Sequence, residues 1–351
     1  MREQANSAQD NPLKGRDLKV DLLKGFLVAL MVVFHCASMV IARRPVLAPI
    51  LNHLDFLHLA FLVTSGFVIG IHYIPLVESG NLPQIRSRVR WRGVRILFTF
   101  ISINIGAYVT GILAIGQLRE VFLTRGSALT RLLLFPDGNL YATEVLFHIG
   151  VFLLLISYTL RRDAAKLAFC SAIVCLPLSK FSSLFLTSSA GFVGVLLASG
   201  YRLFWVSKLD KRIGRQLAIF GVLLTGVLFL RSAKPEICPS WILAGILILS
   251  SAACTTVCFL FTILALPLFR VLRLDGVVME CGRYTLFAYV WQMILIRIVA
   301  LVASRHNLDV FTEYCYSVVI VVVATGVSVL VLKRLRRQYG WINTVYKSAL
   351  E

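Results

Sequence analysis

A histidine inside a long apolar run is the first residue whose type and position could support chemistry. His35 lies within the apolar segment 22–42, which is long enough to cross a bilayer as a helix. An ionisable side chain inside a membrane span is costly and is therefore a candidate functional residue. Histidine is also the commonest general base in enzymes. The structural alternative is a buried histidine bonded to a neighbouring helix.

Charged residues gather just before the same span and predict where the membrane surface lies. Asp21 precedes His35 by 14 residues, which is about 21 Å along a straight helix. The two side chains therefore cannot hydrogen-bond to each other on one helix. One of them marks the membrane surface, and the other lies deep, past the midplane. Asp21 is expected either to pair with a basic residue or to belong to a solvated helix start.

The residues around His35 also resemble a family motif. Arg16, Asp21, Lys24, Gly25 and His35 follow the spacing R-x4-D-x2-[RK]-G-x9-H. This pattern is similar to the opening motif of the membrane-integral acyltransferase-3 superfamily, whose members move acyl groups from a cytoplasmic donor to sugars and glycans. The resemblance implies that His35 is catalytic. The usual arginine is replaced by Lys24, so a bidentate guanidinium contact would be lost there, but not the charge.

Three further stretches extend this resemblance. The segment from Asp55 to Gly70 follows the pattern D-x5-F-x3-SG-x3-G and is similar to the OpgC-type branch, whose members succinylate periplasmic glucans. The stretch from Gly282 to Tyr289 is similar to the superfamily's G-x-x-S-L-x-x-[FY] segment. Within the segment from Asp55 to Gly70, the pair Ser65-Gly66 favours close helix packing over a nucleophilic serine. The third stretch resembles the superfamily's R-x2-R element and holds three arginines: Arg88, Arg92 and Arg95.

Acyl transfer to a hydroxyl would give these residues distinct roles. A base must take the hydroxyl proton, and the resemblance gives that role to His35. A coenzyme A thioester needs cations for its phosphates, and its pantetheine arm is long enough to reach a buried histidine. The predicted donor-binding residues at the cytoplasmic face are Asp21, Lys24, Arg88, Arg92, Arg95 and Arg283. The ordinary alternative is that such basic residues only determine topology.

A second ionisable pair lies in a later apolar run. Glu144 and His148 are separated by four residues, so they share one face of a helix. Structural pairing and function are equally open for this pair. If the pair is functional, Glu144 orients a catalytic histidine or binds acceptor hydroxyls, and Arg297 is a possible counter-ion. The candidate catalytic residues are therefore His35, Glu144 and His148.

The composition places all these residues in a polytopic membrane protein. The 351 residues are 58% hydrophobic, with a mean hydropathy of +0.82 and several long apolar runs. We expect an all-α transmembrane bundle, with one domain over 21–340 between a mobile tail at 1–20 and a second tail at 341–351. Residues 76–95 are expected to form a basic loop. The ten expected spans are 22–42, 55–75, 96–116, 141–160, 164–181, 184–205, 216–231, 241–268, 284–303 and 315–332.

The distribution of charge predicts the orientation. With the amino terminus inside, most of the 36 Lys and Arg residues fall in cytoplasmic segments, which puts both termini in the cytoplasm. The same loops account for the net charge of +19, and nucleic-acid binding is not expected because no basic domain exists outside the spans. The eight cysteines show no metal-ligand spacing, so neither a zinc site nor a redox motif is supported and no metal is expected. No bound cofactor is expected either. A disulfide between Cys238 and Cys315 stays open.

The sequence thus favours a membrane O-acyltransferase in a bacterial-type inner (plasma) membrane. It would move an acetyl or succinyl group from acyl-CoA to a hydroxyl of a glycan or glycolipid. Buried ionisable residues also suit a transporter or flippase of a lipid-linked substrate, although the chain lacks repeated halves. A catalytically inactive relative is a further alternative, since Lys24 replaces an arginine and Gln292 stands near the place where some relatives carry a histidine. The acyl group, the acceptor, O- versus N-acylation and the oligomeric state stay open.

Overall fold

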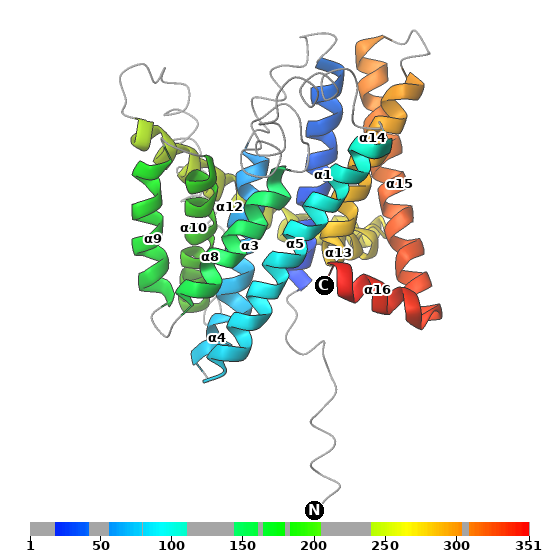
Figure 1. Cartoon of the computed structure of the whole chain (residues 1–351). Helices are drawn as coiled ribbons and strands as arrows, with labels where there is room; N and C mark the ends of the chain where they lie inside the picture. The colour runs from blue at the N-terminus through cyan, green and yellow to red at the C-terminus, as the bar shows by residue number, and fades with distance from the viewer. Residues whose placement is uncertain are drawn as a thin grey trace, which may run out of the picture.

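All the secondary structure in the described part of the chain is helical. The structure, a computed structural model, describes residues 18–41, 56–78, 80–110, 144–160, 164–179, 183–204, 240–303 and 309–350. The all-α prediction is confirmed for these residues, and Figure 1 shows most of the helices running side by side as a bundle. The helices are α1 (Leu18–Ile41), α3 (Leu57–His72), α4 (Ile74–Glu78), α5 (Leu82–Thr110), α8 (Glu144–Thr159), α9 (Ala164–Leu178), α10 (Ser183–Phe204), α12 (Ser240–Val271), α13 (Asp275–Arg283), α14 (Thr285–Ala303), α15 (Val310–Gln338) and α16 (Gly340–Leu350).

Apolar helices occupy most of the expected spans. Shorter apolar helices lie within α8, α9, α10 and α14, which correspond to four of those spans. The expected span at 216–231 falls outside the described residues, and the total of ten stays a prediction. Within the described residues, four helical segments are long and apolar enough to cross a membrane: Leu18–Ser38, Leu57–Val77, Ala244–Thr262 and Val310–Gln338.

The prediction of a basic loop over 76–95 is wrong. Helix α4 ends at Glu78 and α5 already begins at Leu82, so the arginines of this stretch lie on a helix. The reason is an amphipathic pattern between the charges: Ile85, Val89 and Ile96 recur at helical spacing and are all buried. The arginines therefore have fixed positions on α5 relative to its buried face.

Two more helices occur where no helix was expected. Helix α13 lies between the expected spans 241–268 and 284–303, and α16 lies where a carboxyl-terminal tail was expected. Between them, α15 is capped at its amino end by Asp309, whose side chain accepts a hydrogen bond of 3.0 Å from the backbone nitrogen of Thr312. Hydrogen bonding to Thr312 holds the pKa of the exposed Asp309 carboxyl below its usual value.

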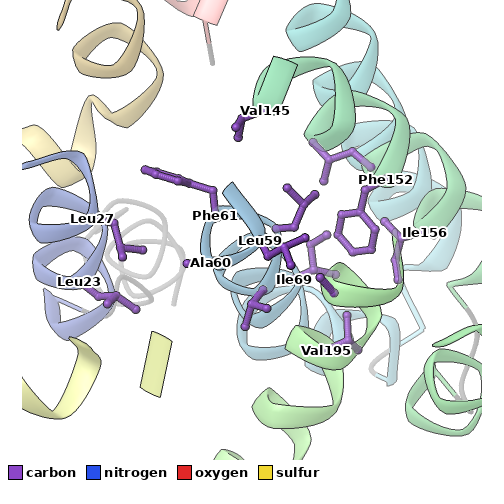
Figure 2. Packing of buried hydrophobic residues seen from close by; sticks show 14 of the residues in the cluster. Leu23, Leu27, Leu59, Ala60, Phe61, Ile69, Val145, Phe152, Ile156 and Val195 are labelled. Carbon is purple, nitrogen blue, oxygen red and sulfur yellow. The ribbon is translucent and has the colours of Figure 1, made fainter. Parts of the chain in front are cut away.

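The hydrophobic core gathers around α3. Figure 2 shows Leu23 and Leu27 of α1 on one side of this helix, with Phe152 of α8 and Val195 of α10 on the other. All four side chains are at most 2% exposed. Helix α3 thus joins the first helix of the chain to the α8–α10 part of the bundle.

Small residues let α3 and α10 approach closely. A Cβ atom on Gly66 would overlap the carbonyl oxygen of Gly191, and a Cβ on Gly194 would overlap that of Val63. Between membrane helices, such close approach supplies van der Waals contact that the hydrophobic effect does not provide in lipid. Gly66 of the Ser65-Gly66 pair is therefore a packing residue.

We expect Gly66→Ala to lower the Tm of the detergent-solubilised protein by several degrees. The added methyl group must push α3 and α10 apart, and overpacking of this kind costs about 1–3 kcal/mol. Gly276→Ala is the matched control, because a Cβ atom at that position meets no atom within 4 Å. Differential scanning fluorimetry measures both, and equal Tm values would contradict the packing role of Gly66.

Candidate active site

A cavity of about 570 Å³ lies beside the first turns of α1, within the size range of small-molecule sites. Helices α1, α3, α5, α8, α13, α14 and α16 all contribute to its wall. The wall combines apolar side chains, such as Val68, Ile69 and Leu286, with a set of polar ones. The polar and charged lining residues are Asp21, Lys24, Thr64, Ser65, His72, Tyr73, Arg92, Arg283, Thr285, Tyr289 and Tyr346.

A buried carboxylate organises the charges of this cavity. Asp21 is only 2% exposed, and its Oδ2 atom lies 3.8 Å from the Nε atom of Arg283. Its Oδ1 atom lies 3.6 Å from the Nζ atom of Lys24. Arg92 of α5 is the remaining charged lining residue, so three cations and one carboxylate face the cavity. The structure thus brings together four of the predicted donor-binding residues, and their net charge favours an anionic ligand.

Two glycines bring Asp21 and Arg283 together. A Cβ atom on Gly25 would overlap the carbonyl oxygen of Val278, and a Cβ on Gly282 would overlap the carbonyl oxygen of Asp21. Helices α1 and α13 therefore pack with their backbones in close contact. This explains physically why both of the stretches around Asp21 and Arg283 contain a glycine next to their charged residues.

A second carboxylate extends the charge network to α15. Glu280 is buried, and its Oε1 atom accepts hydrogen bonds of 2.7 Å from both Arg283 Nη1 and Lys333 Nζ. Sequence reasoning missed Glu280 and Lys333. The signal for the first was present, because Glu280 precedes Arg283 by three residues and so shares its helix face. The contact with Lys333 crosses 53 positions of sequence, and no local pattern indicates it.

His35 lies away from this cavity. The described residues that line the cavity do not include His35, which sits 14 residues beyond Asp21 on α1. Its neighbours Val32 and Cys36 belong to a small apolar cluster formed with α14 and α15. The structure therefore separates the predicted base from the predicted donor-binding residues along the length of α1.

The imidazole of His35 is incompletely bonded. Within the described part of the chain, its Nε2 atom is buried and has no hydrogen-bond partner. Arg297 of α14 is close enough to act electrostatically on His35, and its own Nε atom is likewise buried and without a hydrogen-bond partner there. Gln292, fully buried on the same helix, has the same property at both side-chain amide atoms. Buried polar atoms of this kind call for water or a ligand.

The remaining predicted site residues lie elsewhere. His148 is buried on α8 and is not among the described lining residues, whereas Val145 and Ile149 beside it are. The side chain of Glu144 falls outside the description, so its pairing with His148 or Arg297 stays a prediction. Arg88 is exposed one helical turn before Arg92 and does not line the cavity as described.

Three cavity residues were not singled out as functional from the sequence. His72 lies seven positions after Ser65, and this spacing places both on one face of α3. Thr64 is buried in the wall, and its Oγ1 atom has no hydrogen-bond partner among the described residues. Tyr346 comes from α16, the helix that was expected to be a tail, and nothing in its local sequence indicates the cavity.

The cysteines and other potential metal ligands add no further site. Among the described residues, no group of three or more His, Cys, Asp or Glu side chains could hold a metal ion. Cys238 lies outside the described residues, so the possible disulfide with Cys315 stays a prediction.

We expect Glu280→Gln and Lys333→Met each to lower stability, and the double variant to lose less than the sum of the two. Each single change leaves a charged partner in a partly buried site, and a hydrogen bond to a charged group is worth about 2 kcal/mol. Thermal unfolding of the wild type, the two single variants and the double variant in one detergent gives a double-mutant cycle. Additive losses would mean that the 2.7 Å contact between Glu280 and Lys333 does not couple α13 to α15.

Comparison with known proteins identifies the family. A family model described as an acyltransferase domain, of the acyltransferase-3 type, matches residues 17–333, which is most of the 351-residue chain. The match contains every cavity-forming helix except α16. Neither the curated proteins nor the solved structures give a match to the chain. The chain belongs to the acyltransferase-3 family, which indicates a membrane acyltransferase.

Proposed function

We propose that this membrane acyltransferase binds an acyl-CoA thioester in the cavity beside Asp21 and transfers the acyl group to a hydroxyl of a glycan or glycolipid. The observation that carries the proposal is the charge of the cavity, whose wall holds the three cations Lys24, Arg92 and Arg283 and one carboxylate, Asp21. Coenzyme A is anionic at its phosphates, and guanidinium groups bind phosphate through charge-assisted hydrogen bonds. The apolar part of the wall suits the pantetheine arm and the acyl chain.

His35 is the general base in this proposal. The acceptor oxygen attacks the thioester carbonyl, a C–O bond forms, and the C–S bond breaks. The hydroxyl proton passes to His35 Nε2 and then to the sulfur of coenzyme A, which leaves as the thiol. The buried, unpartnered Nε2 atom of His35 supports this role, because an acceptor hydroxyl would supply the missing hydrogen bond.

Helix α1 connects the two ends of the proposed reaction path. Asp21 anchors the donor cations at one end, and His35 lies about 21 Å further along the same helix. An extended pantetheine arm directed along α1 would carry the thioester from the cavity toward the base. In this arrangement the donor enters from the cytoplasmic face of a bacterial-type inner membrane, and the acceptor comes from the outer face or from the lipid.

The proposal also concerns which acyl group is transferred, succinyl or acetyl. The similarity of the segment from Asp55 to Gly70 to the OpgC-type branch favours succinyl, and acetyl is the alternative. Purified protein in detergent is incubated with radiolabelled acetyl-CoA or succinyl-CoA and a membrane glycan extract. Loss of thioester and transfer of label to glycan then identify the preferred donor.

We expect His35→Ala to abolish label transfer while the protein still binds coenzyme A. Loss of a general base lowers the rate by about 10²–10⁴-fold. Binding should stay within about twofold of wild type, because His35 lies outside the donor cavity. His72→Ala runs beside it, since His72 is the histidine that the structure describes on the cavity wall. If His35→Ala transferred label fully and His72→Ala did not, the general base would be His72 in the cavity and not His35.

We expect Arg92→Ala to weaken coenzyme A binding by about tenfold, and Arg88→Ala to leave it unchanged. Both arginines are exposed on α5 one turn apart, but only Arg92 is among the described lining residues. Arg88→Ala is therefore a matched control for the loss of one surface charge. The salt dependence of binding should also become shallower in Arg92→Ala. Equal effects of the two substitutions would indicate a general electrostatic attraction and not a phosphate site in the cavity.

A further inference from the structure

The carboxyl-terminal helix contributes to the cavity although it lies beyond the residues that the family match covers. The match ends at residue 333, and α16 runs from Gly340 to Leu350. Tyr346 of this helix lines the cavity and is only 6% exposed. Figure 1 shows α16 turning away from α15 and crossing the end of the bundle at which α1 begins. The wall at this end is therefore a feature of this chain that the family assignment does not supply.

An arginine of α15 fixes the position of the Tyr346 ring. The guanidinium carbon of Arg336 lies 4.0 Å from the centroid of the Tyr346 ring and 5.3 Å from that of Tyr284. The two tyrosine rings are themselves 5.4 Å apart. Arg336 also donates from Nε and Nη2 to Asn343 Oδ1, at 3.1 and 2.7 Å, one turn before Tyr346. Cation–π contacts and hydrogen bonds together hold α16 in one orientation.

A second contact ties α16 to the helix that carries Arg92. Arg95 Nη1 of α5 donates a hydrogen bond of 3.1 Å to the backbone oxygen of Lys347. Arg92 precedes Arg95 by three residues and lines the cavity together with Tyr346. The aromatic ring and the phosphate-binding candidate are thus presented to one cavity by two helices that contact each other.

The opposite face of α16 is suited to the membrane surface. Trp341 and Val345, four residues apart on one face, are 68% and 56% exposed. A tryptophan beside apolar residues on a short amphipathic helix is typical of the headgroup region of a bilayer. Contact with lipid on this face, together with the contacts to α5 and α15 on the other, would hold α16 over the end of the cavity.

We propose that Tyr346 binds the nucleotide end of the acyl-CoA donor by stacking on its adenine, and that Arg336 is the residue that positions Tyr346. This inference rests on the proposed function of the cavity. The phosphates of the donor would meet Arg92, and the base attached to them would then meet the aromatic ring presented by the adjacent helix. Nucleobases stack on aromatic side chains because each base offers a π-face.

The test measures binding of coenzyme A and of 4′-phosphopantetheine, which lacks the adenine nucleotide, to the full-length protein in lipid nanodiscs. Tyr346→Leu keeps apolar bulk and removes the aromatic ring, so we expect about tenfold weaker binding of coenzyme A and unchanged binding of phosphopantetheine. Tyr346→Phe keeps the ring and should bind both ligands as wild type does. Trp341→Ala changes the lipid-facing side of the same helix and should leave both affinities unchanged.

Variants of Arg336 provide a second, independent test of the inference. Arg336→Gln should raise the KM for the acyl-CoA donor several-fold with little change in kcat, and Arg336→Lys, which keeps the cation beside the rings, should restore part of the difference.

A Tyr346→Leu protein with wild-type affinity for coenzyme A would overturn the inference. Equal weakening of both ligands would overturn it as well, because the ring would then act only as a wall. Failure of the wild type to bind coenzyme A would instead refute the proposed function.

Discussion

The close contact between α1 and α13 is the constraint on which the site depends. Gly25 and Gly282 allow two helix backbones to touch, and this contact sets Asp21 beside Arg283. A buried carboxylate is expensive in a low-dielectric environment unless cations are held near it. Lys24 supplies the second cation from the same helix. Any side chain larger than hydrogen at either glycine would separate the helices and leave the Asp21 carboxylate with less compensation.

The same packing principle recurs through the bundle, with different consequences. Gly66 and Gly194 bring α3 and α10 together without charged side chains, so that contact supports the scaffold. Between α13 and α15 the link is polar, through Glu280 and Lys333. Lipid offers no hydrophobic driving force between helices, so small residues and buried polar contacts carry the specificity of assembly. Helix α13 makes one contact of each kind, a glycine contact with α1 and a polar contact with α15, and the cavity lies beside this helix near the start of α1.

Much of the fold could be predicted from hydropathy, but the elements that shape the cavity could not. Helices α1, α3, α12 and α15 can be predicted from long apolar runs, because an apolar run of this length indicates a helix that crosses the bilayer. The part of α5 before residue 96 is predicted to be a loop because its arginines dominate the composition, although the buried Ile85 and Val89 between them have helical spacing. Helices α13 and α16 are short, and each contacts a helix far away in sequence, α1 for the former and α5 for the latter. The pairing of Asp21 with a basic residue was open to prediction, whereas Tyr346 on the cavity wall was not.

Because His35 lies away from the cavity, the spacing within the opening motif has a structural meaning: it sets the position of His35 relative to Asp21. The spacing from Asp21 to His35 is fixed at 14 residues, and a continuous α1 turns this spacing into a fixed distance and a fixed rotation about one axis. A rigid helix anchored by its contact with α13 therefore sets where His35 lies relative to the donor cations. Insertion of one residue between them would rotate His35 by about 100° around α1 while leaving every residue type in place. The chemistry would depend on the register of one helix as much as on the identity of its residues.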